Sequence, residues 1–100
     1  MEIRTIAEGK SATFEVEGKL TVQTAPELEA AIGAVESDVC DLAVDLTGVD
    51  YVSSAGLRVF VAAEKLAMGR GGTFRLLHPH DDVMEVLEMT GLSEVLTVER

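Results

Sequence analysis

Segments with the hydrophobic period of a β-strand alternate with segments that have the period of an α-helix along this chain. Residues 11–17 alternate apolar and polar side chains, as a half-buried strand does. From Leu28 to Val35 the apolar side chains recur at spacings of three and four, which predicts an amphipathic helix with one buried stripe. This alternation predicts an α/β domain in which strand–helix–strand units form parallel crossovers.

The predicted order of elements is β-β-α-β-α-β-α-β. The first two strands flank the turn Glu8-Gly9-Lys10 and predict an opening hairpin, so the small sheet is expected to be mixed. Gly18 is expected to end the second strand. Asp41–Leu46 is short and apolar with little alternation, which predicts a strand covered on both faces. The predicted strands are 3–6, 11–17, 41–46 and 73–77, with a last short strand offered by Val95, Leu96 and Val98 in the closing segment 92–98.

The predicted helices have recognisable ends. Thr24 is expected to cap the first helix, with Pro26 and Glu27 in its first turn. The second helix is expected over Ser54–Met68, and the third from His80 or Asp81 to Gly91. The residues of the third helix that are expected to face the core are Val83, Val86 and Leu87.

The charge balance restricts the classes of partner. Eighteen Asp and Glu residues stand against eight Lys and Arg, for a net charge of −10 over 100 residues. Nucleic acids and anionic membranes bind proteins through clustered positive charge, so neither is expected as a direct partner. The apolar content of 47% is too high for a disordered acidic chain and suits one domain over residues 1–100.

The sequence also argues against a disulfide-linked protein, a cysteine-bound metal site, a membrane-spanning protein and a secreted protein. The single Cys40 cannot form an internal disulfide, and no cysteine cluster predicts a metal or cofactor site. The longest uncharged runs, Leu20–Pro26 and Tyr51–Leu57, are far too short to span a bilayer. Residues 1–10 lack the apolar stretch of a secretion signal. We therefore expect a cytoplasmic protein without membrane insertion.

Two serines stand where the third strand leads into the second helix. Ser53 or Ser54 is well placed to cap that helix, because a serine oxygen there accepts an otherwise unpaired backbone N–H. The same N-terminus favours an anion, so a phosphate on Ser54 would be stabilised there. Ala55 and Gly56 leave room for a bulky partner. Capping alone is the simpler role of both serines.

One strip of the second helix has the composition of an interface. At about 100° per residue, Ser54, Arg58 and Lys65 fall close to one line, with Val61 and Ala62 beside it. Cations at the ends and small apolar residues between them suit a protein interface. An ordinary solvated helix with two scattered cations is the alternative. The core face of this helix is expected to carry Leu57, Phe60 and Leu66.

The segment Asp45–Leu57, with its Ser-Ser-Ala-Gly-Leu core, resembles the signature of bacterial anti-sigma factor antagonists, the small single-domain members of the STAS family. Gly18–Thr21, Gly71-Gly72 and Val86–Leu92 resemble further family segments in order and spacing. The likeness covers nearly the whole chain and implies a STAS-type fold.

The resemblance also implies a function without catalysis or cofactors. In that family the serine at the position of Ser54 is phosphorylated by a partner that is both anti-sigma factor and serine kinase. The unphosphorylated domain binds this partner and frees the sigma factor, and a phosphoserine phosphatase restores that state. Many members carry Asp at the positions of Ser53 and Thr21, and Ser53 is the alternative acceptor. The expected partner-binding residues are Thr21, Ser53, Ser54, Arg58, Val61, Ala62 and Lys65.

Two other functions are compatible with parts of this sequence. A STAS domain can instead serve as an adaptor subunit of a lipid-transport ATPase or of a stress-signalling scaffold. A serine hydrolase would take its catalytic residues from Ser54, His78 or His80, and Asp81 or Asp82. Val52 stands where a Gly-x-Ser-x-Gly nucleophile elbow needs its first glycine, which argues against this enzyme. Two histidines without further ligands are also too few to predict a metal site.

Overall fold

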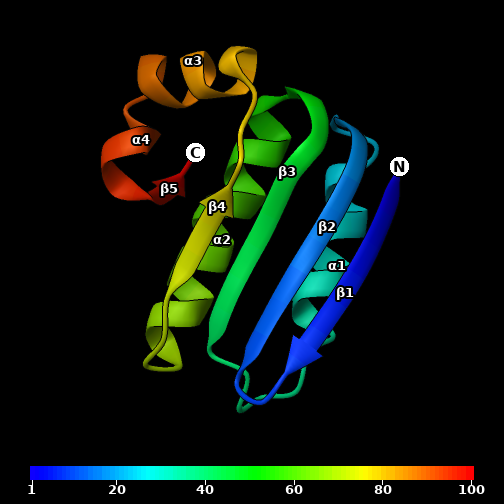
Figure 1. Ribbon diagram of the computed structural model, residues 1–100, viewed down its shortest axis with the longest axis vertical. Coiled ribbons are helices and arrows are strands. Elements are labelled where there is room, and N and C mark those ends of the chain that lie inside the picture. The colour runs from blue at the N-terminus through cyan, green and yellow to red at the C-terminus, as the bar shows by residue number, and fades with distance from the viewer.

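The computed structural model describes all of residues 1–100 as an α/β domain with one sheet and four helices (Figure 1). The predicted order of elements is confirmed, with one helix added near the C-terminus. In chain order the elements are β1 Glu2–Glu8, β2 Ser11–Leu20, α1 Ala25–Gly33, β3 Asp41–Val52, α2 Ser54–Gly69, β4 Phe74–Leu77, α3 Asp81–Met89, α4 Leu92–Val95 and β5 Thr97–Glu99.

The sheet is mixed, as the opening hairpin predicts. Its five strands lie in the order β1-β2-β3-β4-β5. β1 pairs antiparallel with β2 through a turn at Gly9, whose φ of 60° suits glycine. All other neighbours are parallel, so each later strand is reached by a helical crossover.

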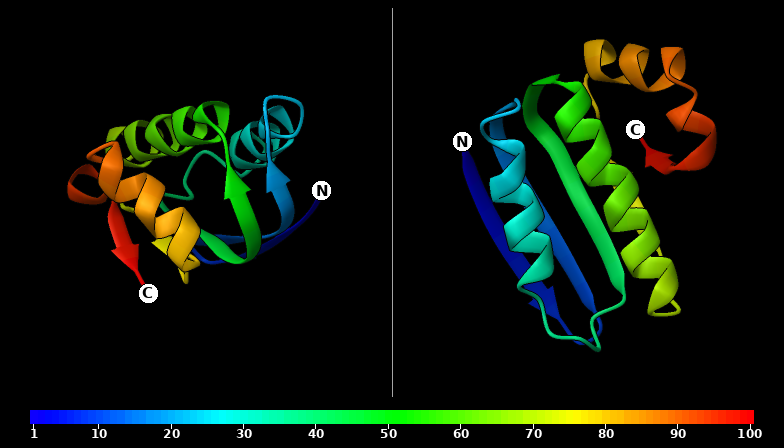
Figure 2. Two further views of the ribbon diagram at one scale, coloured as in Figure 1. Left: turned by 90° about the horizontal axis from the view of Figure 1, so that it is seen from above. Right: turned by 180° about the vertical axis from the view of Figure 1, so that it is seen from behind.

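α1 and α2 lie side by side over one face of the sheet (Figure 2). The core fills the space between them and the inward side chains of β2, β3 and β4. The alternation of β2 and the apolar stripe of α1 both point into this layer, as the periodicity predicts. Its large, fully buried side chains include Phe14, Leu28, Val44, Phe60, Phe74 and Leu76.

The opposite face of the sheet carries no helix, so the prediction that β3 is covered on both faces is wrong. Leu42 and Val44 are buried under the helices, whereas Asp41 and Asp45 are only half-buried on the open side. The sequence of β3 shows little alternation because Ala43, an apolar residue, stands between Asp41 and Asp45 on that open side. We call this side the open sheet face.

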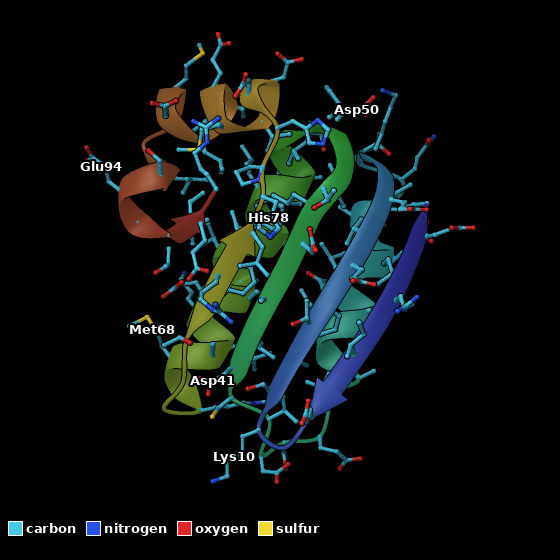
Figure 3. The ribbon with its side chains drawn as sticks, viewed as in Figure 1. Lys10, Asp41, Asp50, Met68, His78 and Glu94 are labelled. Atoms are coloured by element: carbon cyan, nitrogen blue, oxygen red, sulfur yellow. The ribbon has the colours of Figure 1, made fainter.

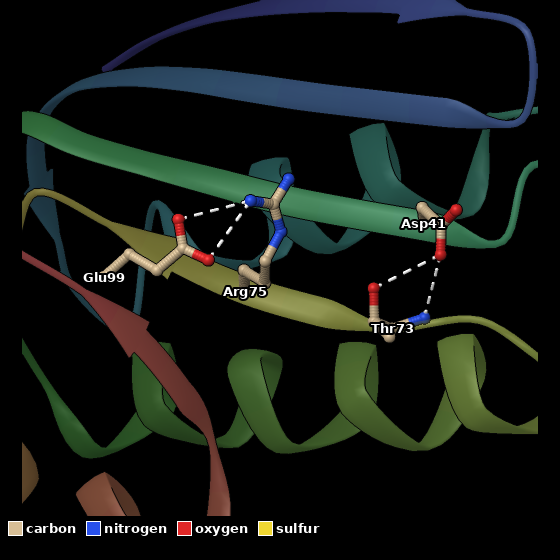
Figure 4. A network of polar contacts seen from close by, with 4 residues as sticks. All are labelled: Asp41, Thr73, Arg75 and Glu99. Carbon is tan, nitrogen blue, oxygen red and sulfur yellow. Dashed lines mark hydrogen bonds and ion pairs between the residues drawn. The ribbon is translucent and has the colours of Figure 1, made fainter.

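Polar contacts join the strands across the open sheet face (Figure 4). Arg75 on β4 pairs with the carboxylate of Glu99 on β5 at 3.2 Å. Thr73 donates its backbone N–H and its hydroxyl to Asp41 at the start of β3, both at 3.2 Å. These exposed contacts hold the short strand β4 to its neighbours on both sides.

Two strands are longer than the sequence pattern predicts. β2 does not end at Gly18 but continues to Leu20, because Gly18 adopts a φ of +117° at a register shift and lets the strand pass through an irregularity. β3 likewise runs to Val52, where the residues after Leu46 pair with the extension of β2. The extended pair carries the chain directly to the start of α2.

The C-terminal segment is only partly a strand. Gly91, with a φ of +79°, ends the third helix as predicted, but the next residues form the short helix α4. Only Thr97–Glu99 joins the sheet. Val83 and Leu87 of α3 are buried as expected, whereas Val86 is only half-buried, because α3 crosses the end of the sheet and is not packed flat on it (Figure 1).

Candidate functional site

Ser53 is the cap of α2. It has an extended backbone, and its Oγ accepts the N–H of Gly56 at 3.4 Å. Its own N–H donates to the Leu20 carbonyl at the end of β2, at 2.7 Å. The sequence left Ser53 and Ser54 as equal candidates for this role, and the contact with β2 decides between them.

Ser54 is therefore the first helical residue, and its side chain is exposed. Because Ser53 supplies the capping oxygen, the Ser54 hydroxyl is not needed to close the helix. The first N–H groups of any α-helix lack partners within that helix and point toward its N-terminus, where the helix dipole is positive. An anion covalently attached to Ser54 would lie in this field.

Gly56 lets the start of α2 approach the sheet closely. A Cβ at this position would lie 2.8 Å from Cγ1 of Val52 and 3.1 Å from Cβ of Leu20. Both neighbours are buried, so neither can move freely out of the way. The glycine thus fixes how far Ser53 and Ser54 stand from the end of β2.

The loop between β2 and α1 is held by two threonines. Thr24 Oγ1 donates to the Lys19 carbonyl at 2.6 Å and accepts the Thr21 N–H at 2.8 Å. Thr21 Oγ1 accepts the N–H groups of Gln23 at 3.2 Å and Thr24 at 3.3 Å. Thr24 occupies the cap position but its side chain makes no capping hydrogen bond, so the prediction that Thr24 caps α1 through its side chain is wrong. Thr21 Oγ1 acts within the loop.

A shallow apolar groove runs between α1 and α2 beside Ser54. Two depressions, of about 280 and 220 Å³, share Glu29 and Val59 and so form one continuous groove. The two helices that border it face the viewer in the right panel of Figure 2. We call it the α1–α2 groove; its lining includes Val22, Pro26, Glu29, Ile32, Ala55, Arg58, Val59, Ala62 and Leu66.

The predicted strip on α2 is accessible. Ser54, Arg58, Ala62 and Lys65 are exposed, and Val61 is half-buried. The structure places Arg58 and Ala62 on the wall of the α1–α2 groove, while Val61 does not line it. The core side of α2 is formed by Gly56, Val59, Phe60, Ala63 and Ala67. Of the expected core residues Phe60 is fully buried, and Leu57 and Leu66 only pack at the margin.

Sequence reasoning missed two exposed apolar side chains near Ser54. Val22, in the loop before α1, is 72% exposed and lines the groove. Tyr51, near the end of β3, is 49% exposed. The only feature of the sequence that could have indicated an exposed Val22 is that this apolar residue falls inside a predicted loop. Neither contributes to the core, so both enlarge the apolar surface at this end of the domain.

The histidines lie apart from this surface. His80 Nε2 contacts the carbonyl of Thr47 on β3, and neither histidine is hydrogen-bonded to Ser54. Figure 3 shows Asp50 at the end of the sheet where α2 begins, and His78 further along, beside β4. The structure therefore does not assemble the serine hydrolase site considered above. Nor does any group of three His, Cys, Asp or Glu residues converge as metal ligands would.

No helix here combines the length and the apolar character needed to cross a bilayer.

Replacing Ser53 tests its capping role. We expect Ser53→Ala to lower the free energy of unfolding by about 1 kcal/mol, because the Gly56 N–H loses its acceptor. Ser53→Asp retains an acceptor and should change stability by only a few tenths of a kcal/mol. Urea unfolding followed by circular dichroism measures both. A larger loss for Ser54→Ala than for Ser53→Ala would show that Ser54 is the cap.

The chain matches one family model and a curated protein over nearly its whole length. Residues 3–98 match the model of the family described as Mlab, STAS domain. An anti-sigma-B factor antagonist of Staphylococcus aureus is 31% identical over 99 residues, which are 98% of this chain and 92% of that protein.

Solved structures agree. The crystal structure of an anti-sigma factor antagonist from Mycobacterium paratuberculosis is 26% identical, covers 98% of this chain and 84% of its own, and superposes with a TM-score of 0.84. The anti-sigma factor antagonist SpoIIAA in its unphosphorylated form is 15% identical, covers 99% and 89%, and reaches 0.81. The second likeness speaks for the fold alone.

Proposed function

The chain belongs to the STAS domain family, and from this we propose that it is an anti-sigma factor antagonist switched by phosphorylation of Ser54. Unphosphorylated, it binds an anti-sigma factor that is also a serine kinase, and the sigma factor is released. Phosphorylation ends that binding, and a phosphoserine phosphatase restores it. The name of the Staphylococcus aureus relative supports the first part of this proposal.

The observation that carries the proposal is the position of Ser54. Its hydroxyl is exposed at the first turn of α2, while Ser53 performs the capping. A kinase can therefore reach Ser54 without unwinding the helix. In the transfer, Ser54 Oγ forms a bond to the γ-phosphorus of ATP as the bond to ADP breaks, and the hydroxyl proton passes to a base of the kinase. The phosphatase removes the group by hydrolysis: a water oxygen bonds to the phosphorus as the Oγ–P bond breaks, inorganic phosphate leaves, and a proton restores the Ser54 hydroxyl.

The α1–α2 groove supplies the binding surface for the partner. Its lining is largely apolar, and its walls carry small side chains such as Ala55 and Ala62. Arg58 and Glu29 give it charged margins, which suits the polar rim around an apolar interface centre. The groove begins at the turn that holds Ser54, so a partner seated in it also contacts the acceptor.

A phosphate on Ser54 would change this surface in two ways. It adds about −1.5 to −2 charges at the margin of the groove, next to the partner. Arg58 lies four residues further along α2, the spacing at which helical side chains pair. The phosphate would draw the guanidinium of Arg58 toward itself and away from the partner. Both effects weaken binding without unfolding the domain.

The first test is the state of the protein in its own cells. With phosphatases inhibited, we expect intact-mass analysis to show a fraction heavier by one phosphate, mapped by fragmentation to Ser54. The unmodified fraction should co-purify with a kinase-like anti-sigma factor. Phosphate mapped to Ser53 would move the acceptor by one residue, and an unmodified protein under all growth conditions would contradict the switch.

The second candidate is an adaptor subunit of another assembly, such as a lipid-transport ATPase. The match of residues 3–98 to a STAS domain family model is compatible with this function as well, because it fixes the family and not the partner. In that case Ser54 serves only as the first residue of α2, and a charge there leaves partner binding nearly unchanged. The same co-purification separates the two, because it would return a transporter or scaffold in place of a kinase.

A further inference from the structure

The outer edge of β1 is unpaired along its seven residues. β1 lies at the border of the sheet and pairs with β2 in an uninterrupted register from Glu2 to Glu8 (Figure 1). It contains neither a proline nor a bulge, two devices that protect edge strands from further pairing. Its free N–H and C=O groups can therefore accept another strand.

Apolar surface accompanies this edge on both sides of the sheet. On the helix side, a groove of about 340 Å³ lies between β1 and the C-terminal part of α1 and is lined by Thr5, Ala7, Ala31 and Val35, among others. On the open sheet face, Ile6 is 42% exposed. An added strand binds specifically where its alternate side chains pack against apolar surface of this kind next to the edge.

We propose that a second copy of this chain pairs with β1, edge to edge and antiparallel, in a register centred on Ile6. A twofold axis between two antiparallel strands must lie perpendicular to the sheet. Two residues that lie directly opposite each other project to the same face of the sheet, and this axis does not exchange the two faces. Opposed residues must therefore be an even number of positions apart in the strand sequence. The axis then passes beside one residue and not between two, so only registers centred on a residue are possible. The charges along β1 distinguish among these registers.

Two of the alternative registers oppose like charges. A centre on Arg4 places the two copies of Arg4 opposite each other. A centre on Thr5 places Glu2 opposite Glu8 twice. Like charges directly opposite are destabilising in a sheet.

Two further registers also fail. A centre on Ala7 places Arg4 opposite Lys10 twice. A centre on Ile3 leaves Ile6–Glu8 unpaired and the groove beside α1 uncovered.

The register centred on Ile6 opposes unlike charges throughout. Arg4 of each copy faces Glu8 of the other, and Glu2 faces Lys10 just beyond the strand. The two Ile6 side chains meet on the open sheet face, where one alone is exposed. The unlike pairs occur twice by symmetry, and each contributes a few tenths of a kcal/mol to about 1 kcal/mol.

The resulting dimer has one continuous sheet of ten strands, five from each copy. Both α1 helices lie on the same side of it, and their grooves join over Thr5 and Ala7. Arg4 already pairs with Glu15 of β2 at 3.3 Å and would be flanked by a carboxylate on each side. Pairing of so few residues gives a weak, concentration-dependent dimer. The α1–α2 groove remains free, so this inference does not depend on the proposed function.

Sedimentation velocity over a concentration series from about 10 μM to about 1 mM tests the dimer, a range suited to weak interfaces. We expect the mass to rise from 10.7 kDa toward twice that value. Glu8→Arg places arginines opposite each other, and Arg4→Glu places glutamates opposite each other. Each variant alone should dimerise at least about tenfold more weakly, as two reversed pairs imply.

Mixing the two variants is the decisive step. In a heterodimer of Arg4→Glu with Glu8→Arg, both charged pairs are again of opposite sign, so the mixture should regain most of the wild-type association. Glu85→Arg on α3 makes the same charge change at an exposed site far from β1 and should dimerise like wild type. Circular dichroism checks that every variant is folded. Wild type that stays monomeric throughout, or a mixture no stronger than its components, would overturn the proposal.

Discussion

Ser54→Asp is expected to weaken binding of the anti-sigma factor by about 100-fold, or close to 3 kcal/mol. Ser54 is exposed and directly precedes Ala55, which lines the α1–α2 groove, so a carboxylate at position 54 adds a negative charge beside the proposed binding surface. The fold should be unaffected, because acidic residues are favourable in the first turn of a helix. Isothermal titration calorimetry with the co-purified partner measures the effect.

Two variants isolate the cause of this loss. Ser54→Ala should bind within about threefold of wild type and take up no phosphate from ATP and the kinase, because a small neutral side chain replaces the acceptor. Ser37→Asp adds the same charge in the exposed loop after α1 and should bind normally. If Ser54→Asp bound as tightly as Ser37→Asp, the switch would be refuted and the adaptor function would be favoured.

Gly56→Ala is expected to lower the free energy of unfolding by about 1–2 kcal/mol, although alanine is the better helix former. Overpacking a core costs about 1–3 kcal/mol, and the gain in helix propensity returns up to about 1 kcal/mol of it. The added Cβ would stand 2.8 Å from Val52 and 3.1 Å from Leu20, so the start of α2 must shift away from β2. The melting temperature should fall by roughly 5–10 °C.

Gly69→Ala is the matched control for this prediction. Gly69 is the last residue of the same helix, and a Cβ there meets nothing within 4 Å. Only the propensity gain remains, so this variant should be as stable as wild type or slightly more stable. Differential scanning calorimetry of the pair measures the difference. Equal effects of the two substitutions would show that the contact of Gly56 with the sheet does not constrain α2.

Much of the candidate site could be predicted from the chain itself. The change of period at Val52–Ser54 located the start of α2, and helical spacing placed Ser54, Arg58 and Lys65 on one accessible side. The α1–α2 groove could not be predicted in this way. Its walls come from Glu29 and Val59, which are far apart in the sequence and meet only because α1 and α2 pack side by side.

The same distinction holds for the fold. The sequence by itself determined the type and order of nearly all elements, because periodicity records how each residue alternates between core and solvent along its own element. Tertiary structure decided which serine caps α2, since Ser53 is fixed by the Leu20 carbonyl of a neighbouring strand. It also extended β3 to Val52 and left one face of the sheet open. Those outcomes depend on backbone pairing and packing between distant segments, which no local pattern encodes.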